Sequence, residues 1–576
     1  MNTLVIVLIA AVVLVCAYAG YGRWLAKTWG VDPNAKTPAV RLEDGKDYVP
    51  TNGWTVFAHQ FSSIAGAGPV TGAIQAAAFG WLPVLLWVLI GGVFFGAVTD
   101  FGALYASVKN DGKSMGLLIE KYIGKTGRKL FLLFCWLFCG IVIAAFADMV
   151  AGTFNAFDAE GAQVEAAFTN GAAGMVSIMF MVFAVVFGFI QKKFNFSGWR
   201  EAVIGIVFIV LSFAVGMNCP LVFGKAAWSY ITFVYIFFAA VLPMWMLKQP
   251  RDYMTTFMFG AMIAGAVIGL LVAHPTMNLP VFTGFNNAKL GTMFPILFVT
   301  VACGAVSGFH SLVSSGTSSK TVENEKDMLK VGYGAMVLES LLAVLALCVA
   351  GAAAAADGTP ATGTPFQIFS RGVAGFFEMF GVPVSIATVF MTMCVSALAL
   401  TSLDAVARIG RMSFQELFSV DDMEHTEGWR KLFCNVYFST FITLAFGFLL
   451  TQIGYANIWP LFGSANQLLS ALVLATLCVF LKVTGRNNKM LFPPLVIMLC
   501  VTFTALVQRL IAMVKAISAA ASTAIPAGET TWGAVFIANG LQLILAVLLI
   551  VLGLNIVFHS VKSYTTCDAP EAKATV

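Results

Sequence analysis

Long apolar segments, separated by short polar stretches, repeat along almost the whole chain. A helix needs about 20 apolar residues to cross a bilayer, because its backbone groups must be paired within the segment. On that length criterion the pattern predicts about fifteen spans. They are residues 3–22, 54–79, 81–106, 129–151, 171–190, 202–218, 226–247, 253–273, 293–315, 329–354, 382–405, 432–451, 456–481, 490–513 and 533–558. We therefore predict an all-α polytopic membrane protein.

Composition supports this prediction and limits what else the chain can contain. Of the 576 residues, 59% are hydrophobic and only 11% are charged, whereas a soluble domain carries about a quarter charged residues. We predict one integral membrane domain over residues 1–576, with a core at 54–481 and peripheral spans at 1–23 and 490–558. The net charge of +5 comes from short basic clusters between apolar segments, so we expect contact with lipid and none with nucleic acid.

The basic residues also predict how the chain lies in the membrane. With the N-terminus outside and the C-terminus in the cytoplasm, nearly all of the 33 lysines and arginines fall on the inner side. The exceptions are Lys225, Lys289, Arg371, Arg509 and Lys515. Such a bias is typical of inner loops.

Three spans contain glycine and polar residues where a simple anchor would be apolar, at 57–72, 303–320 and 459–470. Glycine costs a helix about 1 kcal/mol and proline about 3, so these runs favour interrupted helices. Free helix ends inside a membrane are where many transporters bind ions and solutes. The alternative is close packing through small residues. The candidate substrate-binding residues are Ser62, Ser63, Gly66, Gly68, Ser307, His310, Ser311, Ser314, Asn466 and Gln467.

Ionisable residues inside spans are costly and suggest function. His59, Asp100, His310 and Asp404 are predicted at similar depth in the inner half of the membrane, where carboxylate–imidazole pairs can exchange a proton. Two alternatives remain open: Asp404 can pair with Arg408 one turn later, and Glu339 can be a protonated, hydrogen-bonded side chain. The candidate proton-coupling residues are His59, Asp100, Glu339 and Asp404.

Other chemistry is disfavoured. The chain has no nucleotide-binding Walker sequence, no metal-ligand cluster and no credible catalytic constellation, so we expect no enzyme activity, no cofactor and no metal. Two histidines at depth are too few to suggest a haem protein with ligands from facing helices.

Several uncommon motifs resemble the carbon starvation protein A family of bacterial inner-membrane transporters. They are DGKDYVPTN at 44–52, FAHQFSSIAGAGPVTG at 57–72, VTDF at 98–101, VLPMWMLKQPRDYMTTF at 241–257, CGAVSGFHSLVSSGTSSK at 303–320, SLDAVARIGR at 402–411 and NIWPLFGSANQLLSALVL at 457–474. They occur in the family's order over most of the chain. One departure is that His59 is followed by Gln60, where the longest members have a second histidine.

The resemblance implies a fold of the amino-acid–polyamine–organocation superfamily, with inverted repeats of five helices. It also implies uptake of pyruvate with a proton, or of peptides, when carbon is scarce. We expect a proton-coupled symporter for a small carboxylate, with pyruvate as the first candidate, in the bacterial inner membrane, with Na⁺ coupling left open. The alternatives are a peptide transporter and a membrane sensor of starvation.

Overall fold

The computed structural model describes residues 2–45, 48–158, 160–194, 198–243, 245–288, 290–419, 428–522 and 532–567. Within these ranges, eleven helices are long and apolar enough to cross a membrane. Two shorter apolar helices, Lys225–Val241 and Val436–Thr451, coincide with two more predicted spans. The remaining two predicted spans are interrupted helices. The helical membrane fold is thus confirmed, while the count of fifteen crossings stays a prediction.

The described part of the first half of the chain contains thirteen α-helices. They are α1 (Thr3–Ala17), α2 (Arg23–Trp29), α3 (Pro38–Arg41), α4 (Gly53–Ile64), α5 (Ala67–Ala76), α6 (Trp81–Gly91), α7 (Ala97–Val108), α8 (Met115–Tyr122), α9 (Lys125–Phe154), α10 (Ala167–Phe194), α11 (Trp199–Asn218), α12 (Lys225–Val241) and α13 (Lys248–Ala273). Short π-helical turns at Tyr18–Gly22 and Gly92–Gly96 join α1 to α2 and α6 to α7.

The second half begins with a small hairpin and continues as helices. These elements are β1 (Asn286–Asn287), β2 (Gly291–Thr292), α14 (Met293–Thr300), α15 (Gly308–Gly316), α16 (Ala335–Ala353), α17 (Pro365–Glu378), α18 (Val384–Phe418), α19 (Trp429–Cys434), α20 (Val436–Thr451), α21 (Tyr455–Val483), α22 (Phe492–Ser522) and α23 (Trp532–Thr566).

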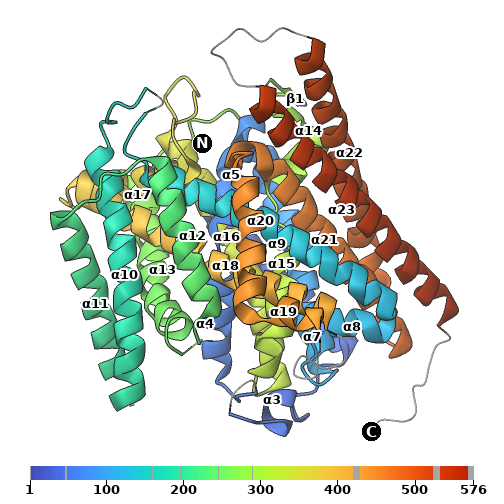
Figure 1. Ribbon diagram of the computed structural model, residues 1–576. Coiled ribbons are helices and arrows are strands. Elements are labelled where there is room, and N and C mark those ends of the chain that lie inside the picture. Colours follow the sequence, from blue (N-terminus) through green and yellow to red (C-terminus); the bar gives the residue numbers. More distant parts are fainter. Residues whose placement is uncertain are drawn as a thin grey trace.

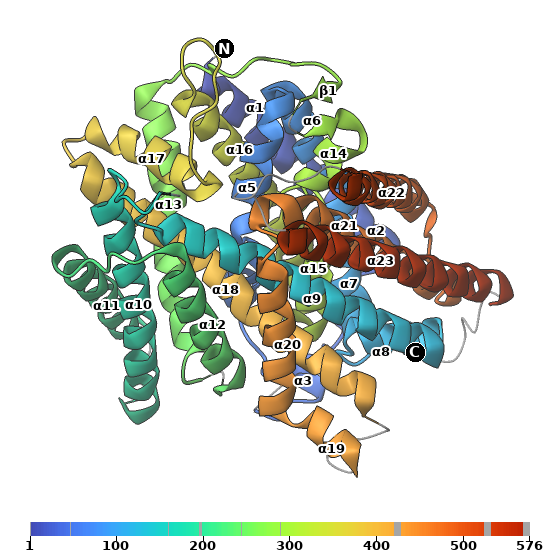
Figure 2. The same cartoon turned by 45° about the horizontal axis from the view of Figure 1, so that its top comes forward.

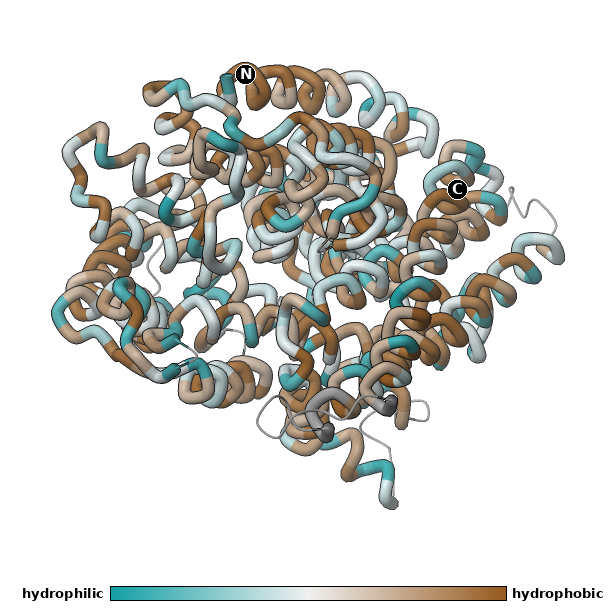
Figure 3. Tube along the Cα trace, turned by 90° about the horizontal axis from the view of Figure 1, so that it is seen from above, coloured by the Kyte–Doolittle hydropathy of each residue, from teal (hydrophilic) through white to brown (hydrophobic). Residues whose placement is uncertain are grey.

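The helices pack around a central group, with two pairs at opposite edges. Helices α10 and α11 lie at one edge and α22 and α23 at the other (Figures 1 and 2), while α9, α18 and α21 pack in the middle. Apolar stretches follow the outer helices in Figure 3, and large hydrophobic side chains such as Val210 on α11 and Leu554 on α23 are exposed. An apolar periphery of this kind matches a lipid environment.

The first predicted interruption is confirmed at Ala65 and Gly66, between α4 and α5. Ala65 has ψ 65° and Gly66 has φ −83° and ψ −155°, which are not helical. Pro69 lies in the first turn of α5, where its missing N–H removes no helical hydrogen bond. The glycines and this proline therefore end one helix and start another inside the predicted span.

The second predicted interruption is also confirmed. Helix α14 ends at Thr300 and α15 starts at Gly308, and the residues between them belong to neither helix. Ser307 is the N-cap residue of α15 rather than part of its helical face.

The third expected interruption, within 459–470, is wrong. Helix α21 is continuous from Tyr455 to Val483 and contains Pro460. Pro460 lies so close to the start of the helix that it removes only one early hydrogen bond. The two amide side chains of this run, Asn466 and Gln467, instead form hydrogen bonds with backbone groups at the second interruption.

Helix α17 was not expected, because it falls between the predicted spans 329–354 and 382–405. It starts with a capping box, in which Thr364 accepts from the Gln367 N–H and the Gln367 side chain accepts from the Thr364 N–H. Of the five basic residues assigned to the outer side, Lys289 lies outside the described residues. The membrane orientation, the repeat relation and the division into core and peripheral spans stay predictions.

Candidate functional site

The two interrupted helices lie against each other, and glycines permit the close approach. A Cβ at Gly72 of α5 would lie 2.6 Å from the Thr300 carbonyl oxygen at the end of α14. A Cβ at Gly68 would collide with the Cys303 side chain. Real Cβ atoms do not come so close, so any larger residue at Gly68 or Gly72 requires movement of the facing chain.

The end of α14 is held by side chains that occupy its free carbonyl groups. Gln467 Nε2 donates to the Phe298 carbonyl at 2.8 Å, and Trp87 Nε1 donates to the same oxygen at 3.2 Å. Trp459 Nε1 donates to the Thr300 carbonyl at 3.2 Å. The last carbonyls of a helix need such partners when they are buried.

The start of α15 is capped by Asn466. Its Oδ1 accepts from the Phe309 N–H at 3.1 Å and from Ser307 Oγ at 3.2 Å. Asn466 and Gln467 thus lie at the second interruption, as the sequence suggested, but both satisfy backbone groups. A direct contact of either amide with substrate stays a prediction.

The start of α5 differs, because no side chain among the described residues caps it. The first N–H groups of a helix have no internal acceptor and carry partial positive charge. The hydroxyl of Ser402, on α18, lies against Gly66, where a Cβ would collide with it. This helix end is therefore suited to an anion.

A closed cavity of about 20 Å³ lies beside the start of α5, which is room for about one water molecule. Its wall is almost entirely apolar, and the polar residues beside it are Ser402, His310 and Asn466, together with Gly66 and Gly68. Its apolar side is aromatic and is formed by Phe138, Phe146, Phe309 and Phe462. Four candidate residues from the sequence, Gly66, Gly68, His310 and Asn466, line this cavity.

Three buried ionisable side chains meet behind the cavity: Asp100 from α7, His310 from α15 and Glu339 from α16. His310 Nδ1 lies 3.0 Å from Asp100 Oδ2, and His310 Nε2 lies 3.3 Å from Glu339 Oε2. All three side chains have 0% exposure. We call this set the histidine triad. The sequence predicted its members separately, and the fold brings them together.

The histidine triad is poorly satisfied by hydrogen bonds. Asp100 Oδ1 and both Glu339 oxygens have no hydrogen-bond partner among the described residues, and the 3.3 Å contact of His310 Nε2 is not aligned as a hydrogen bond. Buried polar atoms without partners are rare and costly, so a set of them calls for a functional explanation.

Asp404 belongs to a different cluster, so its proposed pairing with Arg408 is wrong. Asp404 forms an ion pair with Arg251 of α13 and accepts a hydrogen bond from the Tyr235 hydroxyl at 2.8 Å. Arg251 also pairs with Asp252 at 2.8 Å. Arg408 instead donates to the Ala239 and Leu242 carbonyls at the end of α12. We call Arg251, Asp252, Asp404 and Tyr235 the arginine cluster.

His59 and the candidate serines lie elsewhere. His59 is exposed on α4, and its electrostatic neighbours are Asp252 and Lys248 rather than His310. Ser62 and Ser311 donate to carbonyls of their own helices, those of His59 and Gly308.

Ser314 accepts from Gln60 Nε2 at 2.8 Å, and Ser63 is buried away from the cavity. The structure therefore does not bring these serines to the cavity. Their role as substrate ligands, like that of His59 in coupling, stays a prediction.

Sequence reasoning missed the arginine cluster and the aromatic side of the cavity. Arg251 and Asp252 were visible only as an adjacent Arg–Asp pair just before the predicted span 253–273, where charges are ordinary and carry no functional signal. Phe138, Phe146 and Phe462 carry no such signal, because phenylalanine is frequent in apolar spans.

Comparisons with known proteins agree with this picture. A family model described as carbon starvation protein CstA matches residues 2–359 and 351–505. The chain belongs to the carbon starvation protein CstA family. It is therefore a multi-pass membrane protein of a transporter family.

Among its relatives, "Peptide transporter CstA" of Escherichia coli (strain K12) is 32% identical, over 88% of this chain and 80% of that protein. "Peptide transporter CstA" of Bacillus subtilis (strain 168) is 30% identical, over 85% of this chain and 87% of that protein. "Pyruvate/proton symporter BtsT" of Escherichia coli (strain K12) is 36% identical, over 61% of this chain and 49% of that protein.

Solved structures to which the chain has a weak similarity include a manganese transporter of Eremococcus coleocola, with 12% identity, a TM-score of 0.46 and coverage of 91% of this chain and 99% of that one. Another is MhsT in complex with L-phenylalanine, with 13% identity, a TM-score of 0.44 and coverage of 88% and 99%.

Proposed function

We propose that the protein is a proton-coupled symporter that imports a small carboxylate, with pyruvate as the first candidate, across the bacterial inner membrane. One observation carries the proposal. His310 lines the cavity beside the uncapped start of α5, and the same imidazole lies between two buried carboxylates. The group that meets the substrate is therefore also able to carry the proton.

The substrate carboxylate would bind at the start of α5. The N–H groups there and the Ser402 hydroxyl can donate to a carboxylate, and the helix dipole favours its negative charge. The phenylalanines opposite suit a short apolar group, such as the methyl of pyruvate.

Charge explains how binding and protonation would be linked. With His310 protonated and both carboxylates ionised, the histidine triad carries a net charge of −1. An anionic substrate beside it is then repelled in a low-dielectric site. One additional proton neutralises the triad and removes this repulsion, so substrate and proton favour each other's binding. The expected stoichiometry is one proton for each monocarboxylate, with no net charge moved by the pair.

The cavity in this conformation is too small for pyruvate, so transport requires α5 and α14–α15 to separate. The interruptions at Gly66 and between Thr300 and Gly308 are the points where these helices can bend without breaking regular hydrogen bonds. The structure thus corresponds to a closed state in this proposal.

Peptide uptake is the second candidate function. It is favoured by the names of the relatives that match this chain over most of their length, whereas the match to the pyruvate symporter covers about half of that protein. A peptide also has a terminal carboxylate, so the same helix end can bind it. The small aromatic cavity is the reason for placing pyruvate first.

The test is uptake into proteoliposomes of labelled pyruvate and labelled dialanine, under an imposed proton or sodium gradient. We expect pyruvate to accumulate with the proton gradient alone. Asp100→Asn should keep pyruvate counterflow but lose accumulation, because the amide cannot exchange a proton. Accumulation by Asp100→Asn would make Asp100 structural. Accumulation of dialanine and not pyruvate would assign the peptide function.

The predicted orientation can be tested in the same vesicles or in cells. A cysteine at Asp158 or Gly358, in a cysteine-free background, should react with an impermeant thiol reagent from outside, and one at Lys125 or Lys193 should not. Equal labelling at all four positions would contradict the alternating arrangement of the spans.

A further inference from the structure

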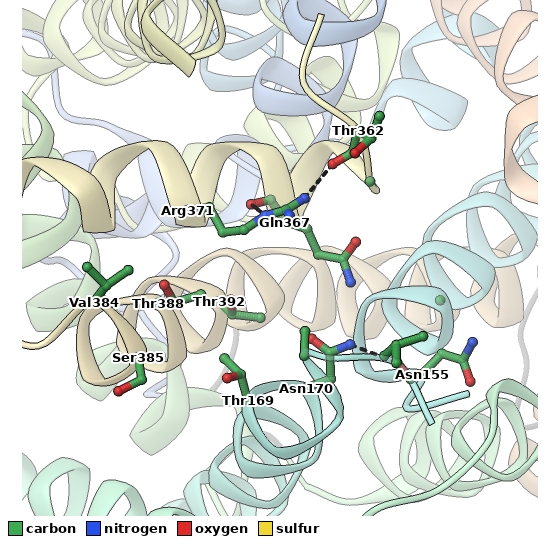
Figure 4. A pocket seen from close by; sticks show the side chains of 14 residues that line it. Asn155, Thr169, Asn170, Thr362, Gln367, Arg371, Val384, Ser385, Thr388 and Thr392 are labelled. Atoms are coloured by element: carbon green, nitrogen blue, oxygen red, sulfur yellow. Dashed lines mark hydrogen bonds between the residues drawn. The ribbon is translucent and has the colours of Figure 1, made fainter. Parts of the chain in front are cut away.

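A second, larger pocket lies near the ends of α9, α10, α17 and α18, on the side that the charge bias assigns to the outside. Its volume is about 570 Å³, within the usual range for small-molecule sites. Figure 4 shows Arg371 and Gln367 from α17, Thr388 and Thr392 from α18, and Asn170 from α10 around it. None of the candidate residues from the sequence lines this pocket.

The lining of this outer pocket is mixed, with hydroxyl and amide side chains among apolar ones, and its one ionisable side chain is cationic. Among the described lining residues only Arg371 is charged, and Glu165, between two lining residues, is not part of the lining. The start of α18 opens on the pocket without a side-chain cap.

Thr392 adds an independent sign of a ligand. Its side chain lines the pocket, it is only 3% exposed, and it has no hydrogen-bond partner among the described residues. A cation, an open helix start and an unpaired threonine hydroxyl at the pocket wall are together suited to a carboxylate.

The same faces of two helices line both the outer pocket and the closed cavity. On α18, Thr388 and Thr392 line the pocket, and Ser402 lines the cavity at a spacing that keeps all three on one side of the helix. On α9, Gly152 lines the pocket and Phe138 the cavity, again on one side, because their spacing is close to about four whole turns. The two sites are therefore about 15 Å apart along one seam, taking ten residues of helical rise from Thr392 to Ser402.

A buried hydroxyl lies one turn beyond Thr392 on α18, on the face of Thr392 rather than that of Ser402. Ser396 of α18 has 0% exposure, and its Oγ has no hydrogen-bond partner among the described residues. An unused polar group between two polar sites is expected on a route that a polar solute passes when the helices separate.

We propose that the outer pocket is a docking site for the carboxylate group of small solutes, with Arg371 as its anion-binding side chain, and that the α9–α18 seam leads from it to the cavity. The proposal rests on the transport function argued above, because it supplies the outer end of that route. Docking itself, however, requires neither proton coupling nor movement of the interrupted helices.

The first test measures binding without transport. Saturation-transfer NMR on the purified full chain would follow the pyruvate methyl group in a His310→Ala background, where the inner cavity is impaired. We expect weak pyruvate binding to persist there and to fall at least tenfold when Arg371→Gln is added. Dialanine should bind in the same way and the uncharged amide of pyruvate should not. Two results would overturn the proposal: pyruvate binding in the His310→Ala background that does not change when Arg371→Gln is added, or no pyruvate binding at all in the His310→Ala background.

The second test measures uptake kinetics. Arg371→Gln should raise the KM for external substrate about tenfold with little change in the maximal rate, and Arg371→Lys should restore most of the affinity. Lys515→Gln is the control, because it removes another predicted outer cation, on α22. Its KM and maximal rate should equal those of the native protein. Native-like KM in Arg371→Gln with normal transport would reject the docking site and leave the symporter intact. No uptake of any carboxylate or peptide by the native chain would reject the symporter, while the NMR test would still decide the docking site.

Discussion

The histidine triad and the arginine cluster are both buried sets of charges joining helices that are distant in the sequence, yet their chemistry differs. In the triad, an imidazole lies between Asp100 and Glu339. In the cluster, a guanidinium lies between Asp252 and Asp404. Arginine stays protonated in proteins, whereas histidine changes charge near neutral pH. Two carboxylates around a fixed cation can hold helices together, whereas two carboxylates around an imidazole are the set that the proposed proton coupling would use.

Their positions agree with this difference. His310 lines the closed cavity, and no member of the arginine cluster does. Arg251 does not lie at a helix interruption either, since α13 is continuous from Lys248 to Ala273. The comparison therefore separates charges that hold helices together from charges that can respond to a substrate.

The largest effect on stability is expected from Arg251→Met. It leaves Asp252 and Asp404 buried without their cation, and breaking a buried ion pair from one side costs about 3–5 kcal/mol. The thermal midpoint of the purified protein in detergent, or the loss of folded protein, measures this cost. Adding Asp404→Asn should recover part of it. A native-like midpoint for Arg251→Met would show that the cluster does not hold helices together.

The comparison is sharpest when one chemical change is made in both sets. Asp404→Asn should lower stability by about 1–3 kcal/mol, the cost of a lost buried partner, and keep proton-driven accumulation. Glu339→Gln in the triad should leave the thermal midpoint nearly unchanged, because its oxygens accept no hydrogen bond from described residues. It should also change the pH dependence of uptake. The reverse pattern would exchange the roles of the two sets.

A smaller effect is expected at the contact between the interrupted helices. Gly68→Ala should destabilise the closed state by about 1–3 kcal/mol through overpacking. The reason is its collision with Cys303. Gly68→Ala combined with Cys303→Gly removes the facing side chain and should recover most of the stability and of the substrate affinity. Failure of the double variant to recover would place the effect of Gly68 in the backbone rather than in this contact.

The smallest effect is expected at Asp357, an exposed carboxylate that serves as a baseline for both buried sets. Hydrogen bonds from Thr359 hold the pKa of Asp357 below its ordinary value. The ionised form therefore adds a little stability at neutral pH, which is lost as the pH falls through that lowered pKa. Asp357→Asn should lower the thermal midpoint barely measurably at pH 7 and not at all once the native carboxyl is protonated. A large change at pH 7 would contradict the exposed geometry.

The sequence by itself determined the fold class and most helix positions, because a bilayer requires long apolar helices with internally paired backbones. It also located the first two interruptions, since glycine and proline act locally. It failed at 459–470, where Pro460 falls near a helix start and is tolerated. It missed α17, because the capping-box residues Thr364 and Gln367 were present between two predicted spans but were not recognised as a helix start.

Only the tertiary structure decided which charges meet. Asp100, His310 and Glu339 are separated by 210 and 29 positions, and nothing local couples them; their meeting depends on how α7, α15 and α16 pack. Asp404 shows the same point in reverse, because Arg408 is its neighbour along the helix and Arg251 is its partner in the fold. Local patterns follow from backbone and solvent, whereas long-range charge pairing follows from the packing of whole helices.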